Sequence, residues 1–136
     1  MYTVLLPVDE AVGPARRQAE FVASLPAAGE AIEVTLTHSM AANESLDEDE
    51  LASLSQVESV QTAKDHLVAN DVDVETMAVS LPLEDGIPQL AEQIDADQIV
   101  MGGRKRSAAG KALFGSITQA VILNTNRSVT VVGSQD

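Results

Sequence analysis

The chain has 136 residues, no cysteine and a formal net charge of −13. At this length we expect one domain over residues 1–136. Without cysteine there are neither disulfides nor thiolate metal sites, which fits a cytoplasmic protein. The acidity argues against nucleic acid as a partner, because a phosphate backbone needs a broad basic surface. No apolar run reaches the roughly 18 residues of a membrane span, so no membrane partner is expected.

The acidic residues are spread along the chain, and lysine is scarce. This composition resembles that of proteins from salt-adapted organisms, whose acidic surfaces keep them in solution in concentrated salt. We favour this halophilic interpretation over that of an ordinary acidic protein, although net charge bears on solubility more than on fold.

Short apolar runs alternate along the chain with segments in which apolar residues recur at helical spacing. A strand is predicted at residues 3–8, and a helix follows that Gly13 and Pro14 open and that ends before Pro26. The next elements are a strand at 32–38, a helix at 55–70, a half-exposed edge strand at 71–79, a helix that follows Gly86 and Pro88 and runs to Ile94, a strand at 99–101, a helix at 116–124 and a strand at 129–132. Ser55 and Ser116 each stand three residues before Glu or Gln, which is the spacing of a capping box.

This alternation predicts an α/β fold, an open three-layer, five-stranded parallel sheet with helices on both faces. In sheets of this class, ligands bind beyond the carboxyl ends of the strands, where the strand order switches. Asp9, Ser39 and Gly102 all lie at such ends, so we expect them to share one crevice. Asp9 by itself is equally well a polar turn residue, and the glycine-rich segment predicted nearby favours a ligand contact.

The segment from Gly102 to Ser116 is the strongest functional signal. Half of the eight cations of the chain lie in it: Arg104, Lys105, Arg106 and Lys111. Glycine lets backbone N–H groups approach a ligand closely, and the start of a helix attracts anions. The segment matches neither the Walker P-loop nor the dinucleotide fingerprint. We interpret it as a phosphate-binding loop rather than as a long loop kept soluble by its charges, because long loops in compact domains are usually functional.

No other pattern indicates catalysis or a metal site. His38 and His66 have no further ligands at metal spacing, so both are expected to be ordinary strand and helix residues. The acidic run at 47–50 lacks the glycine and the spacing of a calcium loop. No Ser-His-Asp arrangement is visible, and Ser116 can serve both as a helix cap and as a phosphate contact.

Taken together, these residues resemble the universal stress proteins, small α/β domains of the adenine-nucleotide alpha hydrolase-like group. The resemblance covers nearly the whole chain, beginning with the strand that ends at Asp9 and passing through Leu36-Thr-His38. It is most specific from Ile99 onward, where Gly102, Gly115 and Ser116 match the G-x2-G-x9-G-[ST] element of the family. Lys105 stands where the second glycine of that element belongs.

The resemblance implies that the chain binds ATP, which Mg²⁺ can accompany, and dimerises through the last strand, Val129 to Val132. Asp9 would contact the ribose or the adenine end, with Val8 and Ser39 lining the adenine pocket. Gly102, Gly115 and Ser116 would hold the phosphates. The predicted binding set is therefore Val8, Asp9, Ser39, Met101, Gly102, Arg104, Lys105, Gly115 and Ser116.

Lys105 leaves two alternatives open. Its side chain could block the close backbone approach that glycine permits, or it could supply charge to the phosphates, as Arg104 and Arg106 could. The expected function is an ATP-binding module for signalling or stress response, with slow or no hydrolysis because no base or water-positioning group is evident. The alternative is an interaction module of the same fold whose phosphate site Lys105 obstructs. A phospho-receiver is disfavoured, because no aspartate ends the third strand.

Overall fold

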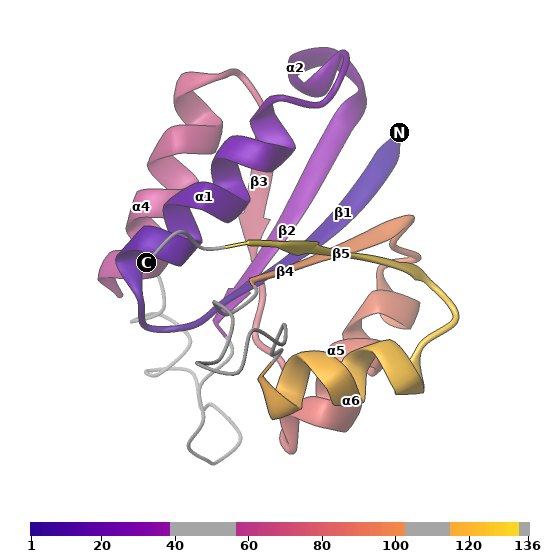
Figure 1. Ribbon diagram of the computed structural model, residues 1–136. Helices are drawn as coiled ribbons and strands as arrows, with labels where there is room; N and C mark the ends of the chain where they lie inside the picture. The colour runs from indigo at the N-terminus through magenta and orange to yellow at the C-terminus, as the bar shows by residue number, and fades with distance from the viewer. Residues whose placement is uncertain (39–56, 103–114, 134–136) are drawn as a thin grey trace.

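The computed structural model describes residues 1–38, 57–102 and 115–133. Its sheet has five parallel strands: β1 (Tyr2–Val8), β2 (Ile32–His38), β3 (Asp73–Thr76), β4 (Gln98–Gly102) and β5 (Ser128–Val132). The strand order is β3-β2-β1-β4-β5, so β1 is central and the order reverses between β1 and β4 (Figure 1). The predicted parallel α/β architecture is confirmed.

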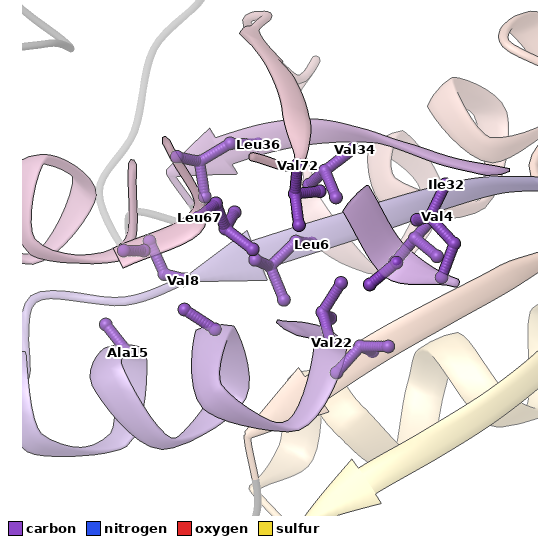
Figure 2. Packing of buried hydrophobic residues seen from close by; sticks show 14 of the residues in the cluster. Val4, Leu6, Val8, Ala15, Val22, Ile32, Val34, Leu36, Leu67 and Val72 are labelled. Atoms are coloured by element: carbon purple, nitrogen blue, oxygen red, sulfur yellow. The ribbon is translucent and has the colours of Figure 1, made fainter. Parts of the chain in front are cut away.

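Helices cover both faces of the sheet (Figure 1). One face carries α1 (Val12–Ala23), α2 (Ala28–Ala31) and α4 (Glu58–Ala69), and the other carries α5 (Leu83–Gln93) and α6 (Ser116–Asn124). Successive side chains of a strand point to opposite faces of the sheet, so a strand can contribute residues to both helical layers. Val4, Leu6 and Val8 pack with α1 and α4, as Figure 2 shows for this cluster, whereas Leu5 packs with α5 and α6.

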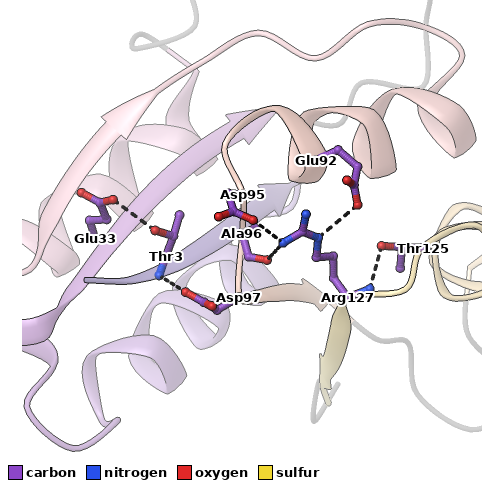
Figure 3. Close-up of polar contacts among 8 residues, drawn as sticks. All are labelled: Thr3, Glu33, Glu92, Asp95, Ala96, Asp97, Thr125 and Arg127. Carbon is purple, nitrogen blue, oxygen red and sulfur yellow. Dashed lines mark hydrogen bonds and ion pairs between the residues drawn. The ribbon is translucent and has the colours of Figure 1, made fainter.

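Polar contacts join the strands at their amino ends (Figure 3). The Thr3 N–H donates to Asp97 Oδ2 at 2.9 Å, and the Thr3 hydroxyl donates to Glu33 Oε1 at 3.1 Å. Just before β5, the Arg127 guanidinium bonds to Glu92 at 3.1 Å and to Asp95 at 2.9 Å. These hydrogen bonds raise the pKa of Arg127. The amino edge of the sheet is therefore fastened by hydrogen bonds and ion pairs.

The prediction for the start of α5 was wrong. The helix begins at Leu83, so Gly86 and Pro88 lie inside it. Gly86 is needed because the backbone of Ser80 packs directly on it. Pro88 lacks the N–H that would bond to the Glu84 carbonyl, and the Asn124 side chain from α6 donates to that carbonyl at 3.3 Å instead.

The two predicted capping boxes were also wrong. The residue before α4 is Val57 and the residue before α6 is Gly115, and neither helix has a side-chain cap. Ser116 is already the first helical residue, which places its hydroxyl one position past the cap; Ser55 lies outside the described residues. The edge strand is half exposed as predicted but is confined to β3, since the chain then turns to bring Ser80 against α5.

Replacing Gly86 by alanine tests the contact between α5 and Ser80. A Cβ at Gly86 would lie 1.7 Å from the Ser80 carbonyl oxygen, so the backbone must move. We expect Gly86→Ala to lower the free energy of unfolding by about 3 kcal/mol. Gly13→Ala is the matched control, because nothing lies within 4 Å of that position in α1, and it should raise stability by about 0.5 kcal/mol. Equal effects in urea unfolding would contradict this packing.

Removing the Arg127 guanidinium should weaken the link between β5 and the end of α5. We expect Arg127→Ala to lower the midpoint of urea unfolding, with the loss shrinking as salt is added, because its carboxylate partners are exposed and screened. Arg16→Ala is the control, since it removes the same charge from the exposed surface of α1 in this acidic chain. If Arg127→Ala lowers the midpoint of urea unfolding no more than Arg16→Ala does, then the lost charge explains the effect and the ion pairs with Glu92 and Asp95 do not.

Candidate functional site

The candidate site lies at the carboxyl ends of β1 and β4, where the strand order reverses. The ladder between β1 and β2 runs on to Val8 and His38, and the ladder between β4 and β5 runs on to Gly102 and Val132. Pairing between β1 and β4 stops earlier, at Leu5 with Ile99. The last residues of β1 and β4 therefore do not pair with one another. Sheets of this class bind ligands at such a position.

Asp9 follows β1 directly and is exposed. Its Oδ1 accepts a hydrogen bond from the Ala11 N–H at 2.8 Å, which shapes the turn into α1. Its carbonyl accepts a hydrogen bond from the Ser59 hydroxyl, which ties the turn to α4. Asp9 is thus a turn residue, and its second carboxylate oxygen can still accept a hydrogen bond from a ligand.

The end of β4 meets the first turn of α6. The Thr118 hydroxyl donates to the Gly102 carbonyl at 3.4 Å, which brings Gly102 close to Gly115 and Ser116. Ser116 is exposed and Gly115 is half-buried. The first N–H groups of a helix have no partner within the helix, so this junction can accept an anion.

Val8 and Met101 lie at the site with their side chains turned away from it. Val8 is buried among residues of α1 and α4, and Met101 is buried among residues of α5 and α6. A ligand would therefore meet only their backbone. Ser39, Arg104 and Lys105 lie outside the described residues.

Gln18 was missed by reasoning from sequence. It lies on α1, is 2% exposed, and its side-chain amide donates to the carbonyls of Pro7 and Val100 at 2.7 and 3.1 Å. It thus joins β1 and β4 beyond the point where their ladder ends. The available signal was Pro7 itself, since proline within a central strand removes a ladder donor that another group must replace.

His38, expected to be an ordinary strand residue, is an unusual one. It ends β2 opposite Val8, is 5% exposed, and neither ring nitrogen has a hydrogen-bond partner among the described residues. Burial lowers its pKa, and the nearby carboxylates of Glu10 and Asp9 oppose that shift only in part. The ring is therefore neutral near pH 7 and keeps hydrogen-bonding capacity beside the candidate site.

Among the residues that the structure describes, no group of three or more His, Asp or Glu side chains could hold a metal ion. Within the same ranges, no helix has the length and apolar character needed to cross a membrane.

The neutral state of His38 should make stability depend on pH. Because its folded-state pKa lies below that of the unfolded chain, the unfolded state binds more protons as the pH falls below about 6.5, and the free energy of unfolding decreases by up to about 1.4 kcal/mol per pH unit. We expect His38→Leu to flatten this slope in urea unfolding at a series of pH values. His66→Gln controls for the loss of a histidine elsewhere, and a slope unchanged by His38→Leu would refute the assignment.

Solved structures with this fold include universal stress proteins. One from Archaeoglobus fulgidus has 25% sequence identity and a TM-score of 0.77, over 97% of this chain and 98% of that chain. The A. fulgidus protein in complex with dAMP has 21% identity and a TM-score of 0.73 over the same shares. A universal stress protein in complex with cAMP has 20% identity and a TM-score of 0.68, over 98% of both chains.

The curated proteins gave no match. The family model described as the universal stress protein family matches residues 1–133. The match takes in all five strands of the sheet and the carboxyl-edge site between β1 and β4. This chain belongs to the universal stress protein family.

Proposed function

We propose that the chain, as one module over residues 1–136, binds an adenine nucleotide, ATP in particular, at the carboxyl ends of β1 and β4. The observation that carries the proposal is the junction of the end of β4 with the first turn of α6, at the reversal of strand order and across from Asp9. Two family members of the same fold hold dAMP and cAMP, which share an adenine base, a pentose and one phosphate.

The described geometry suggests how the ligand is divided between the two strands. The base and sugar would lie at the end of β1, against the backbone of Val8 and the free oxygen of Asp9, with Ser39 beyond β2. The phosphates would lie at the end of β4, from Met101 and Gly102 to Gly115 and Ser116, where N–H groups of α6 can donate. Arg104 and Lys105 would add positive charge to the phosphate end.

Further parts of the proposal concern assembly and chemistry. Mg²⁺ would accompany ATP through its phosphates, and hydrolysis would be slow because the described residues at the phosphate end, from Met101 and Gly102 to Gly115 and Ser116, include no base for an attacking water. Dimerisation would use β5, which is the last strand in the sheet order and is half-buried from Val129 to Val132. Light scattering over a concentration series tests the dimer. The net charge of −13 supports a protein adapted to salt. A sequence without cysteine fits a location in the cytoplasm.

A second function is favoured by one residue, Lys105. If its side chain occupies the phosphate position, the chain would be an interaction module that shares the family fold and binds no nucleotide. The two functions differ in a directly measurable way, because only the first predicts that a nucleotide titrates the folded protein.

Calorimetric titration of ATP with Mg²⁺, in low salt and in molar KCl, tests the nucleotide site. We expect saturable binding, with affinity about tenfold weaker in Arg104→Ala and Lys105→Ala, since each removes a charge-assisted contact with phosphate. Arg16→Ala, on the exposed face of α1, controls for the loss of charge alone. AMP in place of ATP separates contacts with the base and sugar from contacts with the outer phosphates.

Two results would decide against parts of this proposal. If the folded protein binds neither nucleotide and releases none on denaturation, the interaction module is the better description. If Lys105→Gly strengthens ATP binding substantially, then Lys105 obstructs the site and does not compensate charge.

A further inference from the structure

Pro7 stands within the central strand β1, where proline costs the sheet a hydrogen bond. Inside sheets, proline is otherwise confined to edges and bulges because it has no N–H. Pro7 is buried, with Thr37 of β2 as its register partner. The Asp97 N–H donates to the Thr3 carbonyl at 2.8 Å, so the backbone groups of Thr3 face β4. By the alternation along a strand, those of Leu5 and Pro7 face β4 as well.

The carbonyl of Val100 is the group that loses its donor. Leu5 is paired with Ile99, and in a parallel ladder the next N–H of β1 on this side would donate to the Val100 carbonyl. That N–H would belong to Pro7, and the pairing of β1 with β4 ends at this step. A buried carbonyl without a donor is costly, so another group must supply one.

Gln18 supplies that donor from α1. Its Nε2 lies 3.1 Å from the Val100 carbonyl oxygen and 2.7 Å from the Pro7 carbonyl oxygen. We infer that the Gln18 amide replaces the N–H missing from Pro7 and thereby fixes the ends of β1 and β4 in the geometry of the nucleotide site. The first part of this inference concerns the sheet alone, and only the second rests on the proposed function.

The bonds of Gln18 lie close to both halves of the site. Asp9 follows Pro7 by two residues, and Gly102 follows Val100 by two residues. A Cβ at Gly102 would lie 2.9 Å from Gln18 Oε1, so the amide end of Gln18 lies directly against the end of β4. Gln18 would therefore set the relative position of the sugar and phosphate ends without touching the ligand, as a positioning residue.

A double-mutant cycle in the absence of ligand tests the replacement of the donor. Gln18→Met removes both hydrogen bonds at similar volume, and Pro7→Ala restores the backbone N–H. We expect Gln18→Met to lower the midpoint of thermal unfolding by about 5 °C, and Pro7→Ala to recover much of that loss only in the Gln18→Met background. The entropic effect of removing proline is the same in both backgrounds and cancels in the cycle.

The cycle gives a decision in each case. Strictly additive effects of the two substitutions would overturn the donor replacement. If Gln18→Met alone does not fold, folding of the double variant carries the same conclusion as a recovered midpoint. Failure of both the single and the double variant to fold would overturn the inference.

Nucleotide affinity tests the positioning role. At a temperature where all variants are folded, we expect AMP and Mg²⁺-ATP to bind Gln18→Met about tenfold more weakly than wild type. Val22→Ala, which removes core volume one turn further along α1, controls for a loss of stability and should bind normally. Unchanged affinity in Gln18→Met, or an equal loss in Val22→Ala, would overturn the positioning role. If the wild type binds no nucleotide, the proposed function fails, and the unfolding cycle still decides the replacement of the donor.

Discussion

The hydrogen bonds from Gln18 to β1 and β4 are the constraint on which the carboxyl edge of this sheet depends. β1 is central and buried on both faces, so every layer packs against it. Its ladder with β4 nevertheless ends at Leu5, and a side chain from α1 supplies the donor that the backbone lacks. The position of the last residues of both strands therefore follows from how α1 packs. A helix that buries the core on one face also places the two halves of the site.

The two edges of the sheet differ in how their polar groups are satisfied. At the amino edge, Thr3 and Arg127 bond to carboxylates and to backbone. At the carboxyl edge, buried polar groups of Thr37, His38 and Thr76 have no partner among the described residues, and at the amino end of β4 the same is true of Gln98 Oε1. Unpaired buried polar groups cost stability and are uncommon in native proteins. Three of these four residues lie at the carboxyl edge, which is the edge where we propose that a ligand binds.

The fold could be predicted because strands and helices are marked by patterns among neighbouring residues. The errors arose where contacts between residues far apart in the sequence determine where an element begins. Apolar runs alternating with segments of helical spacing placed all five strands and the longer helices between them, but not the four-residue helix α2. Gly86 and Pro88 suggested a helix boundary, but a contact with Ser80 and a bond from Asn124 make both residues acceptable inside α5. For the site, residues at strand ends could be named because topology gathers such ends. The helical pattern of α1 could not reveal Gln18, since it does not distinguish a buried glutamine that bonds to two strands from one that faces solvent. The one signal in the sequence was Pro7, which leaves a ladder acceptor without its donor.

Electrostatics then bears on which nucleotide this edge would prefer. The described residues near the end of β1 include the carboxylates of Asp9 and Glu10, in a chain of net charge −13, and both repel phosphate. A helix start contributes only about half an elementary charge, which suits one phosphate better than three. If ATP binds as proposed, its outer phosphates would therefore depend on the cations of residues 104–111, or on salt that screens the repulsion to within about 3 Å at molar concentration. In the proposed nucleotide site, a preference for ATP over AMP would accordingly be a property of those cations and of the ionic strength, whereas recognition of adenosine would be a property of the strand ends that Gln18 joins.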